Sequence, residues 1–177
     1  MVRLFTLVLS LLAAAPAALA EDYPTPADGE RIVFDVYRKG DIEFGTHEVA
    51  FERDGGDVVA RTTIRLRAGF GPITVFRYEH DATERWNDGR LMLLTSRTLK
   101  DGETYEVSAR YEDGMISVDG EDPDEGSVSL TLPPDILSSS HWHGYPADMR
   151  EMLNTEHGTV METTVEDLGR TEIEGDG

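Results

Sequence analysis

Two histidines flank a tryptophan in the sequence His141-Trp142-His143. In an extended segment the side chains at i and i+2 point to the same side, and such an imidazole pair can bind zinc or copper. A third ligand would have to come from His157, His80 or Glu156 through tertiary proximity. Because metal sites need three or four ligands, the alternative is a buried Trp142 with both histidines bonded to the backbone. We predict no cofactor and keep His141 and His143 as candidate metal ligands.

A second candidate site is the acidic stretch from Asp119 to Glu125, which carries five carboxylates. Carboxylate oxygens are ligands that calcium prefers. The spacing matches no EF-hand loop, and Pro123 stiffens its middle. Acidic runs between strands usually mark exposed turns, so the sequence predicts a solvated hairpin loop here.

Residues for nucleophilic or acid-base catalysis are sparse. The chain has no cysteine, and Ser138, Ser139 and Ser140 lack the strand-to-helix elbow that activates a nucleophilic serine. His80 shares a strand face with aromatic residues and could act as a general base tuned by burial. A buried histidine more often has its ring nitrogens satisfied by neighbouring groups, which is the alternative we favour. An enzyme therefore has no support from the sequence.

The N-terminus has the three parts of a secretory signal peptide. Arg3 supplies the positive charge, Leu4 to Leu12 the apolar run, and Ala18-Leu19-Ala20 the small residues of a cleavage site. The apolar run is shorter than the roughly 20 residues that span a membrane. We expect residues 1–20 to be removed, leaving a periplasmic or secreted protein without an integral membrane segment.

Composition excludes some partners. The net charge is −19 at pH 7, and such a surface repels nucleic acid, which binds proteins through lysine and arginine. Without cysteine there is neither a disulfide framework nor a thiol for lipid attachment. The fold must be stabilised by an ordinary apolar core, for which the chain is long enough.

From Arg31 onward, apolar and polar residues alternate with the period of β-strands. Four Asp-Gly pairs separate the alternating runs, and this pair favours tight hairpins: Asp54-Gly55, Asp88-Gly89, Asp101-Gly102 and Asp113-Gly114. The pattern predicts an all-β, antiparallel up-and-down meander. Strand twist should curl it into an open or partly closed barrel, with a bend or bulge at Gly69, Gly71 and Pro72.

The pattern changes after Leu132. Asp135 to Ser140 and Pro146 to Leu153 are predicted as short helices, and His141 to Leu153 as a helical lid on the sheet. We expect residues 21–30 to be an extended segment and 31–177 a single β domain. Since Arg170 to Gly177 contains no terminating strand, we also expect the sequence to be truncated at its C-terminal end.

Four short stretches resemble a bacterial family of exported proteins, domain of unknown function 6134. They are Phe76-Arg77-Tyr78-Glu79-His80, Trp86-Asn87-Asp88-Gly89-Arg90-Leu91, Leu132-Pro133-Pro134-Asp135-Ile136-Leu137 and Leu153-Asn154-Thr155. The resemblance extends from Phe34 to Val165 and implies a periplasmic β-sheet protein. It supplies no catalytic residues.

The function that these features favour is non-enzymatic binding. A curved sheet under a lid would enclose a hydrophobic or lipid-like envelope ligand against its aromatic face. The predicted ligand-binding residues are Phe76, Tyr78, Trp86, Tyr105 and Trp142. One alternative is a structural or interaction protein of the envelope that binds a protein partner. A further alternative is that the aromatic residues only fill the core and leave no cavity. Metal-dependent chemistry at His141 and His143 is the least favoured function.

Overall fold

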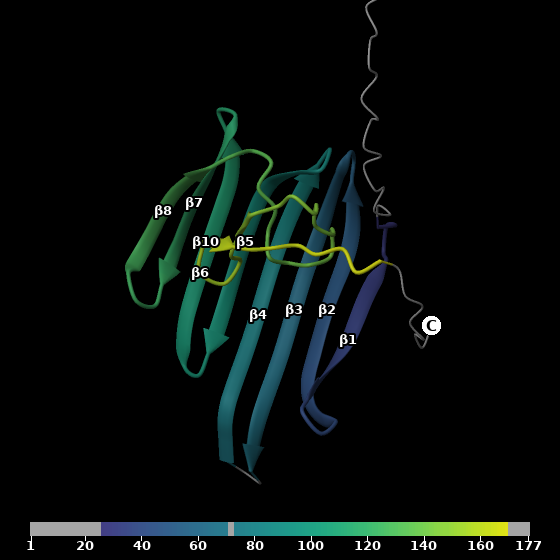
Figure 1. Cartoon of the computed structure of the whole chain (residues 1–177), viewed down its shortest axis with the longest axis vertical. Helices are drawn as coiled ribbons and strands as arrows, with labels where there is room; N and C mark the ends of the chain where they lie inside the picture. Colours follow the sequence, from purple (N-terminus) through teal and green to yellow (C-terminus); the bar gives the residue numbers. More distant parts are fainter. Residues whose placement is uncertain (1–25, 71–72, 170–177) are drawn as a thin grey trace, which may run out of the picture.

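The chain forms one antiparallel sheet of eight strands, in which every strand pairs with its neighbours in sequence (Figure 1). This computed structural model describes residues 26–70 and 73–169. Four stretches lie outside the described residues: the predicted signal peptide at 1–20, residues 21–25, residues 71–72 and the C-terminal residues 170–177. The sheet strands are β1 Arg31–Arg38, β2 Ile42–Asp54, β3 Asp57–Phe70, β4 Ile73–Asn87, β5 Arg90–Lys100, β6 Glu103–Glu112, β7 Met115–Asp122 and β8 Gly126–Leu132.

The predicted meander is confirmed, and three of the four predicted Asp-Gly turns have the expected backbone; at the fourth, Asp54 ends β2 and Gly55 and Gly56 connect it to β3. Asp88, Asp101 and Asp113 each have a positive φ and are each followed by a glycine with positive φ. Two consecutive residues with positive φ match the twist of the flanking strands in a tight hairpin. Burial alternates as expected within β6, where Tyr105, Val107 and Ala109 are buried and the residues between them are exposed.

The sheet is not closed. β1 and β8 remain at its two edges, so the partly closed barrel among our predictions is wrong. One face of the sheet is instead covered by residues 133–169, here called the capping segment, and we call this face the covered face (Figure 1). Because the capping segment removes apolar side chains from water, the sheet does not need to close on itself to form a core.

The predicted helical lid is also wrong, because no helix occurs among the described residues. Pro133 and Pro146 each begin a single turn, closed by bonds from Ile136 N and Met149 N to the proline carbonyl oxygens. Neither turn propagates, because the backbone that follows bonds to other parts of the capping segment. Within it, β9 Glu151–Leu153 pairs with β10 Val160–Glu162.

The core lies between the covered face and the capping segment. Its buried members come from β2 to β8 and from the capping segment: Val49, Phe51, Val58, Ala60, Ala82, Trp86, Leu91, Leu94, Val107, Ala109, Ile116, Val118, Leu132, Ile136 and Leu153. The opposite face of the sheet carries cross-strand ion pairs such as Arg65 with Asp81 and Arg97 with Glu106. In the described part of the chain, no helix has the length and apolar character to cross a membrane.

Candidate ligand-binding site

The capping segment is attached to the sheet at β7. The amide of Glu121 donates a 3.0 Å bond to the carbonyl of His157. This contact depends on Gly120, because a Cβ there would lie 2.3 Å from the same carbonyl oxygen. At β5, the Ser96 hydroxyl donates to the carbonyl of Thr155. Residues 155–157 are therefore fixed against the middle of the sheet.

A second attachment is made by the buried carboxylate of Glu84 on β4. Glu84 is 1% exposed, and its Oε2 accepts bonds from Trp86 Nε1 at 3.0 Å, Ser140 Oγ at 3.1 Å and Trp142 Nε1 at 3.0 Å. Its other oxygen, Oε1, is buried without a partner among the described residues. Hydrogen bonds to a charged acceptor are stronger than neutral ones, so Glu84 holds the capping segment against β4.

Three residues predicted to bind the ligand belong to this interior. Trp86 is 4% exposed and Tyr105 is 7% exposed. Trp142 packs edge-on against both Trp86, with ring centroids 5.8 Å apart, and Phe51, at 5.2 Å. A cavity of about 440 Å³ lies beside Trp86 and Trp142. These rings join the capping segment to the sheet, and their part in ligand binding stays a prediction.

His141 and His143 line different cavities. His141 has a φ of +66°, so the segment is not extended there and the i, i+2 alternation does not apply. His143 packs on Trp86 and places Nε2 3.2 Å from Ser138 Oγ, while its Nδ1 lies 2.9 Å from the Gly144 carbonyl. Within the described ranges, no group of three or more His, Cys, Asp or Glu residues is arranged to hold a metal ion.

His141 instead joins two other histidines around one cavity of about 340 Å³, here called the histidine pocket. His47 comes from β2, His80 from β4 and His141 from the capping segment. The remaining lining residues are mostly polar and include Thr62, Ile64, Tyr78, Ser139, Ser140, Asn154, Thr155, Glu156 and Met161. Side chains far apart in sequence therefore meet where the capping segment crosses the sheet.

All three imidazoles of the histidine pocket have a lowered pKa. Burial is the main cause for each of them, with the neighbouring His141 adding to the effect at His47. For His80, Glu156, Asp81 and Glu84 oppose the effect of burial but do not cancel it. Since the pKa of an unperturbed histidine is about 6.5, these imidazoles are uncharged at neutral pH.

Two of these imidazoles have a fixed partner. His80 Nδ1 lies 2.7 Å from Thr98 Oγ1, and His141 Nδ1 lies 2.8 Å from the Tyr145 hydroxyl. By contrast, His47 Nε2 is buried and has no hydrogen-bond partner in the described part of the chain. A buried polar atom without a partner is uncommon, and a donor or acceptor that reached this nitrogen would be stabilised there.

Glu156 forms one wall of the histidine pocket, and its carboxylate is well satisfied. Tyr78 donates to Oε2 at 3.1 Å, and Lys100 Nζ approaches Oε1 at 3.1 Å. His157 Nε2 also lies 3.0 Å from Oε1. Burial and the adjacent Glu156 raise the pKa of Tyr78, so its hydroxyl remains a hydrogen-bond donor throughout the physiological range.

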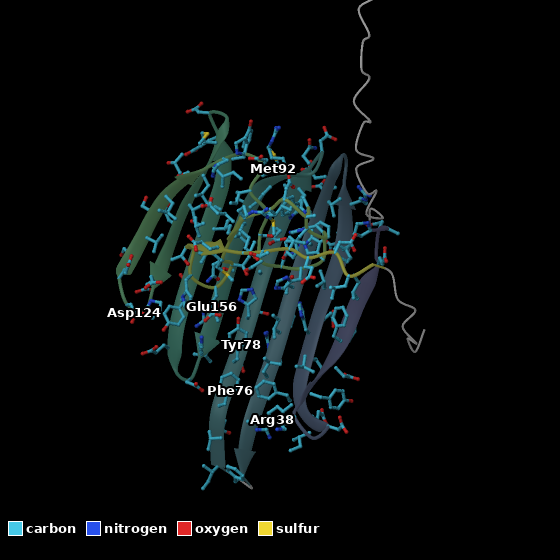
Figure 2. The ribbon with its side chains drawn as sticks, in the orientation of Figure 1. Arg38, Phe76, Tyr78, Met92, Asp124 and Glu156 are labelled. Carbon is cyan, nitrogen blue, oxygen red and sulfur yellow. The ribbon has the colours of Figure 1, made fainter. Side chains whose placement is uncertain are left out.

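Beyond the histidine pocket, the covered face continues past the capping segment as an open apolar surface. It consists of Phe34, Val36, Phe44, Leu66 and Phe76. Phe34 pairs with His47 and Leu66 with Tyr78 across neighbouring strands, which places them on the same face as the histidine pocket. In Figure 2, Phe76 and Arg38 lie on the part of the sheet that the capping segment leaves free.

The rings of this surface are ordered by their own contacts. Phe44 stacks on Phe76 with centroids 5.3 Å apart, and the Arg38 guanidinium lies over Phe44 at 5.7 Å. A hollow of about 680 Å³ nearby belongs mainly to the opposite face, because its lining includes Arg65, Arg67, Arg77 and Glu79, which alternate with Leu66 and Tyr78 along β3 and β4. Of the predicted ligand-binding residues, Phe76 lies on the open apolar surface, and Tyr78 lies at its border with the histidine pocket.

The acidic stretch is only partly a loop: Asp119 to Asp122 belong to β7 and pair with β8, and Pro123 to Glu125 form the turn between the two strands. Asp122 Oδ1 accepts bonds from the amides of Asp124 and Glu125. These backbone bonds lower the pKa of Asp122. The carboxylate therefore organises the turn itself.

Two residues of this region were missed from the sequence. Glu84 follows His80 at even spacing on β4, so strand alternation places it on the same face as His80, although carboxylates are seldom buried. His47 alternates with the buried Val49 and Phe51 in the same way. The feature that could have identified Glu84 and His47 from the sequence is their position in the alternating pattern of the strand, not their residue type.

Comparison with known proteins yields one match. No curated protein and no solved structure matches the chain. The family model for the domain of unknown function DUF6134 matches residues 34–177, which include every strand from β2 to β10 and most of β1. Because the match covers most of the sequence, the chain belongs to the DUF6134 family.

Proposed function

We propose that this protein is a non-enzymatic binding protein of the periplasm or the extracellular medium, and that the apolar part of a lipid-like ligand lies on the open apolar surface. The observation that carries the proposal is the stacked pair of Phe44 and Phe76 on the part of the covered face that the capping segment leaves free. The rest of the same face is buried beneath that segment.

The surface has the properties of a ligand site. Phe34 is 53% exposed, although it is large, apolar and on the same face as the core. Contiguous exposed apolar residues commonly mark binding sites in soluble proteins.

An uncharged apolar dye such as N-phenyl-1-naphthylamine tests this proposal by its fluorescence increase on binding. Phe76→Ser removes a ring from the open apolar surface, and burial of such a side chain is worth roughly 1.5–3 kcal/mol. We expect the affinity for the dye to fall about tenfold or more, since each factor of ten corresponds to about 1.4 kcal/mol.

The matched control is Val33→Ser. Val33 is 57% exposed on β1 but lies next to Phe34 in the strand and thus on the opposite face. It should leave the dye affinity unchanged. Equal affinities for the two variants, or no binding by the unaltered protein, would contradict the proposal. Native mass spectrometry of protein purified without detergent should also detect an apolar molecule of fixed mass.

A second candidate is an envelope protein that interacts with a partner through β1. This edge strand exposes Val33 and Tyr37 on the face opposite the capping segment. A partner strand could extend the sheet there by β-augmentation. Crosslinking in the periplasm from Tyr37 should then trap one dominant protein, and diffuse products would remove the support for this candidate.

A further inference from the structure

The histidine pocket and the open apolar surface are adjacent. Tyr78 lines the pocket and pairs with Leu66 of the open apolar surface across β3 and β4. In Figure 2, Glu156, Tyr78 and Phe76 follow one another along the covered face, from the capping segment toward the free part of the sheet. A molecule whose apolar part lies on Phe76 can therefore extend past Tyr78 to the histidines.

We infer that the histidine pocket binds the uncharged, hydroxyl-bearing head group of the same ligand, which makes the ligand a nonionic amphiphile with a sugar-like or glycerol-like head. This inference rests on the proposed function for the apolar part of the ligand. It adds the chemical class of the head group and the residues that recognise it.

The first argument is the free hydrogen-bonding capacity of the pocket. His47 Nε2 is buried without a partner among the described residues. Thr62 lines the same cavity with a hydroxyl group and Asn154 with the NH2 of its side-chain amide, whereas Ser139 Oγ is already bonded to Thr155 and Asn154 Oδ1 to the amide of Glu156. A hydroxyl group both donates and accepts hydrogen bonds, so it can satisfy a neutral imidazole in either tautomer and these side chains as well.

The second argument is charge. Burial keeps the pKa values of His47 and His80 below that of a free histidine, so neither supplies a positive charge at neutral pH. Among the described residues, those that line the pocket include no lysine or arginine, and Glu156 is a carboxylate among them. A phosphate or carboxylate head would therefore lose hydration in a partly desolvated site without gaining a cationic partner from the lining.

The carboxylates in and around the pocket do not favour a cationic head. Glu156 already interacts with Tyr78, Lys100 and His157. Three donors, including the Trp142 indole, bind Oε2 of Glu84 beneath the capping segment. Asp81 pairs with Arg65 on the opposite face of the sheet. An ammonium group would have to displace one of these partners, whereas an uncharged head displaces none.

Two detergents with the same twelve-carbon chain test the inference: dodecyl maltoside, with an uncharged sugar head, and dodecylphosphocholine, with a charged head. Titration calorimetry is performed on the whole mature protein below the critical micelle concentration of each detergent. We expect the maltoside to bind about tenfold tighter, a difference of about 1.4 kcal/mol.

Thr62→Val and His47→Phe should abolish this preference, because each removes hydrogen-bonding groups from the pocket while keeping its volume similar. Thr95→Val is the matched control for Thr62→Val, since Thr95 is exposed on the opposite face of β5. Both pocket variants should keep their affinity for the apolar dye, which also verifies that they are folded.

The outcomes separate the two proposals. Equal binding of both detergents by the unaltered protein, with dye binding intact, overturns the head-group inference and leaves the proposed function standing. Binding of neither the detergents nor the dye overturns the proposed function. A maltoside preference that survives both Thr62→Val and His47→Phe shows that the head group lies elsewhere and overturns the assignment to the histidine pocket.

Discussion

The indole nitrogen of Trp142 donates a 3.0 Å hydrogen bond to Oε2 of Glu84, 58 residues away in the sequence. The same oxygen accepts bonds from Trp86 and Ser140, so one carboxylate joins β4 to the capping segment. The covered face therefore has a polar attachment within an otherwise apolar core. Its strength can be measured by single substitutions.

Glu84→Gln should destabilise the protein by about 1–3 kcal/mol, because an amide oxygen is a weaker acceptor for the three donors and the NH2 group would be buried at the position of Oε1, which has no partner among the described residues. Urea unfolding measures the loss. Glu106→Gln is the control, since this carboxylate is largely exposed on the opposite face, and such changes stay within about 0.5 kcal/mol. Equal stability of the Glu84 and Glu106 variants would show that Glu84 does not hold the capping segment.

Trp142→Ala should loosen the capping segment at a cost of up to about 3 kcal/mol, because the ring packs on Phe51 and Trp86. The chain has two tryptophans, so Trp86 becomes its single indole fluorophore. We expect its emission to shift to the red as water reaches it. An unchanged emission maximum would mean that the segment is held without Trp142. Tyr37→Ala, at an exposed position of β1, serves as the control.

Stability should fall as the pH drops from about 7.5 to 5.5. The three pocket histidines have folded-state pKa values below the unfolded value of about 6.5, so the unfolded chain binds more protons in this window. Their contribution is complete above the unfolded pKa and is lost as the pH falls through the folded values. Urea titrations at both pH values measure the change.

His80→Gln should reduce this pH dependence, because glutamine can still bond to Thr98 but does not titrate. The groups around His80 are Glu156, Asp81 and Glu84, which favour its protonation, and His47, which opposes it. An identical loss of stability in the variant and in the unaltered protein would assign the effect to other groups.

Gly120→Ala should detach residues 155–158 from β7. Its Cβ would lie 2.3 Å from the His157 carbonyl oxygen and 2.9 Å from the Gly158 Cα, both of which are backbone atoms. Overpacking of this kind costs about 1–3 kcal/mol. Gly56→Ala is a suitable control, because its nearest neighbour is a side-chain atom of Asn87 at 3.6 Å. Thermal unfolding that does not distinguish the two variants would contradict the close contact.

The strands and turns were predictable because both depend on local chemistry. Asp-Gly pairs such as Asp113-Gly114 have the positive φ values that a tight hairpin needs. The bulge expected at Gly69 coincides with a register shift between Ala68 and Gly69. Gly71 and Pro72 lie outside the described residues, and the strands on either side, β3 and β4, pair antiparallel up to Phe70 and Ile73.

The capping segment was less predictable because its conformation depends on distant partners. Pro146 is a common first residue of helices, yet the chain after it continues into β9, where the amide of Leu153 bonds to the carbonyl of Leu137. Rules based on hydrophobic periodicity and helix capping use only neighbouring residues, so they cannot predict a bond between residues that are distant in the sequence. For the same reason the histidine pocket, built from β2, β4 and the capping segment, was not predicted as a unit.

The neighbour-to-neighbour order of the sheet has a consequence for folding. Each strand pairing from β1 to β8 closes only a short loop, which is entropically inexpensive and kinetically fast. The bond from Ser140 to Glu84 spans 56 residues and needs β4 in place beforehand. The sheet should therefore assemble first and the capping segment dock last, and its amides, such as that of Ser139, should exchange with deuterium before those of β4 and β5.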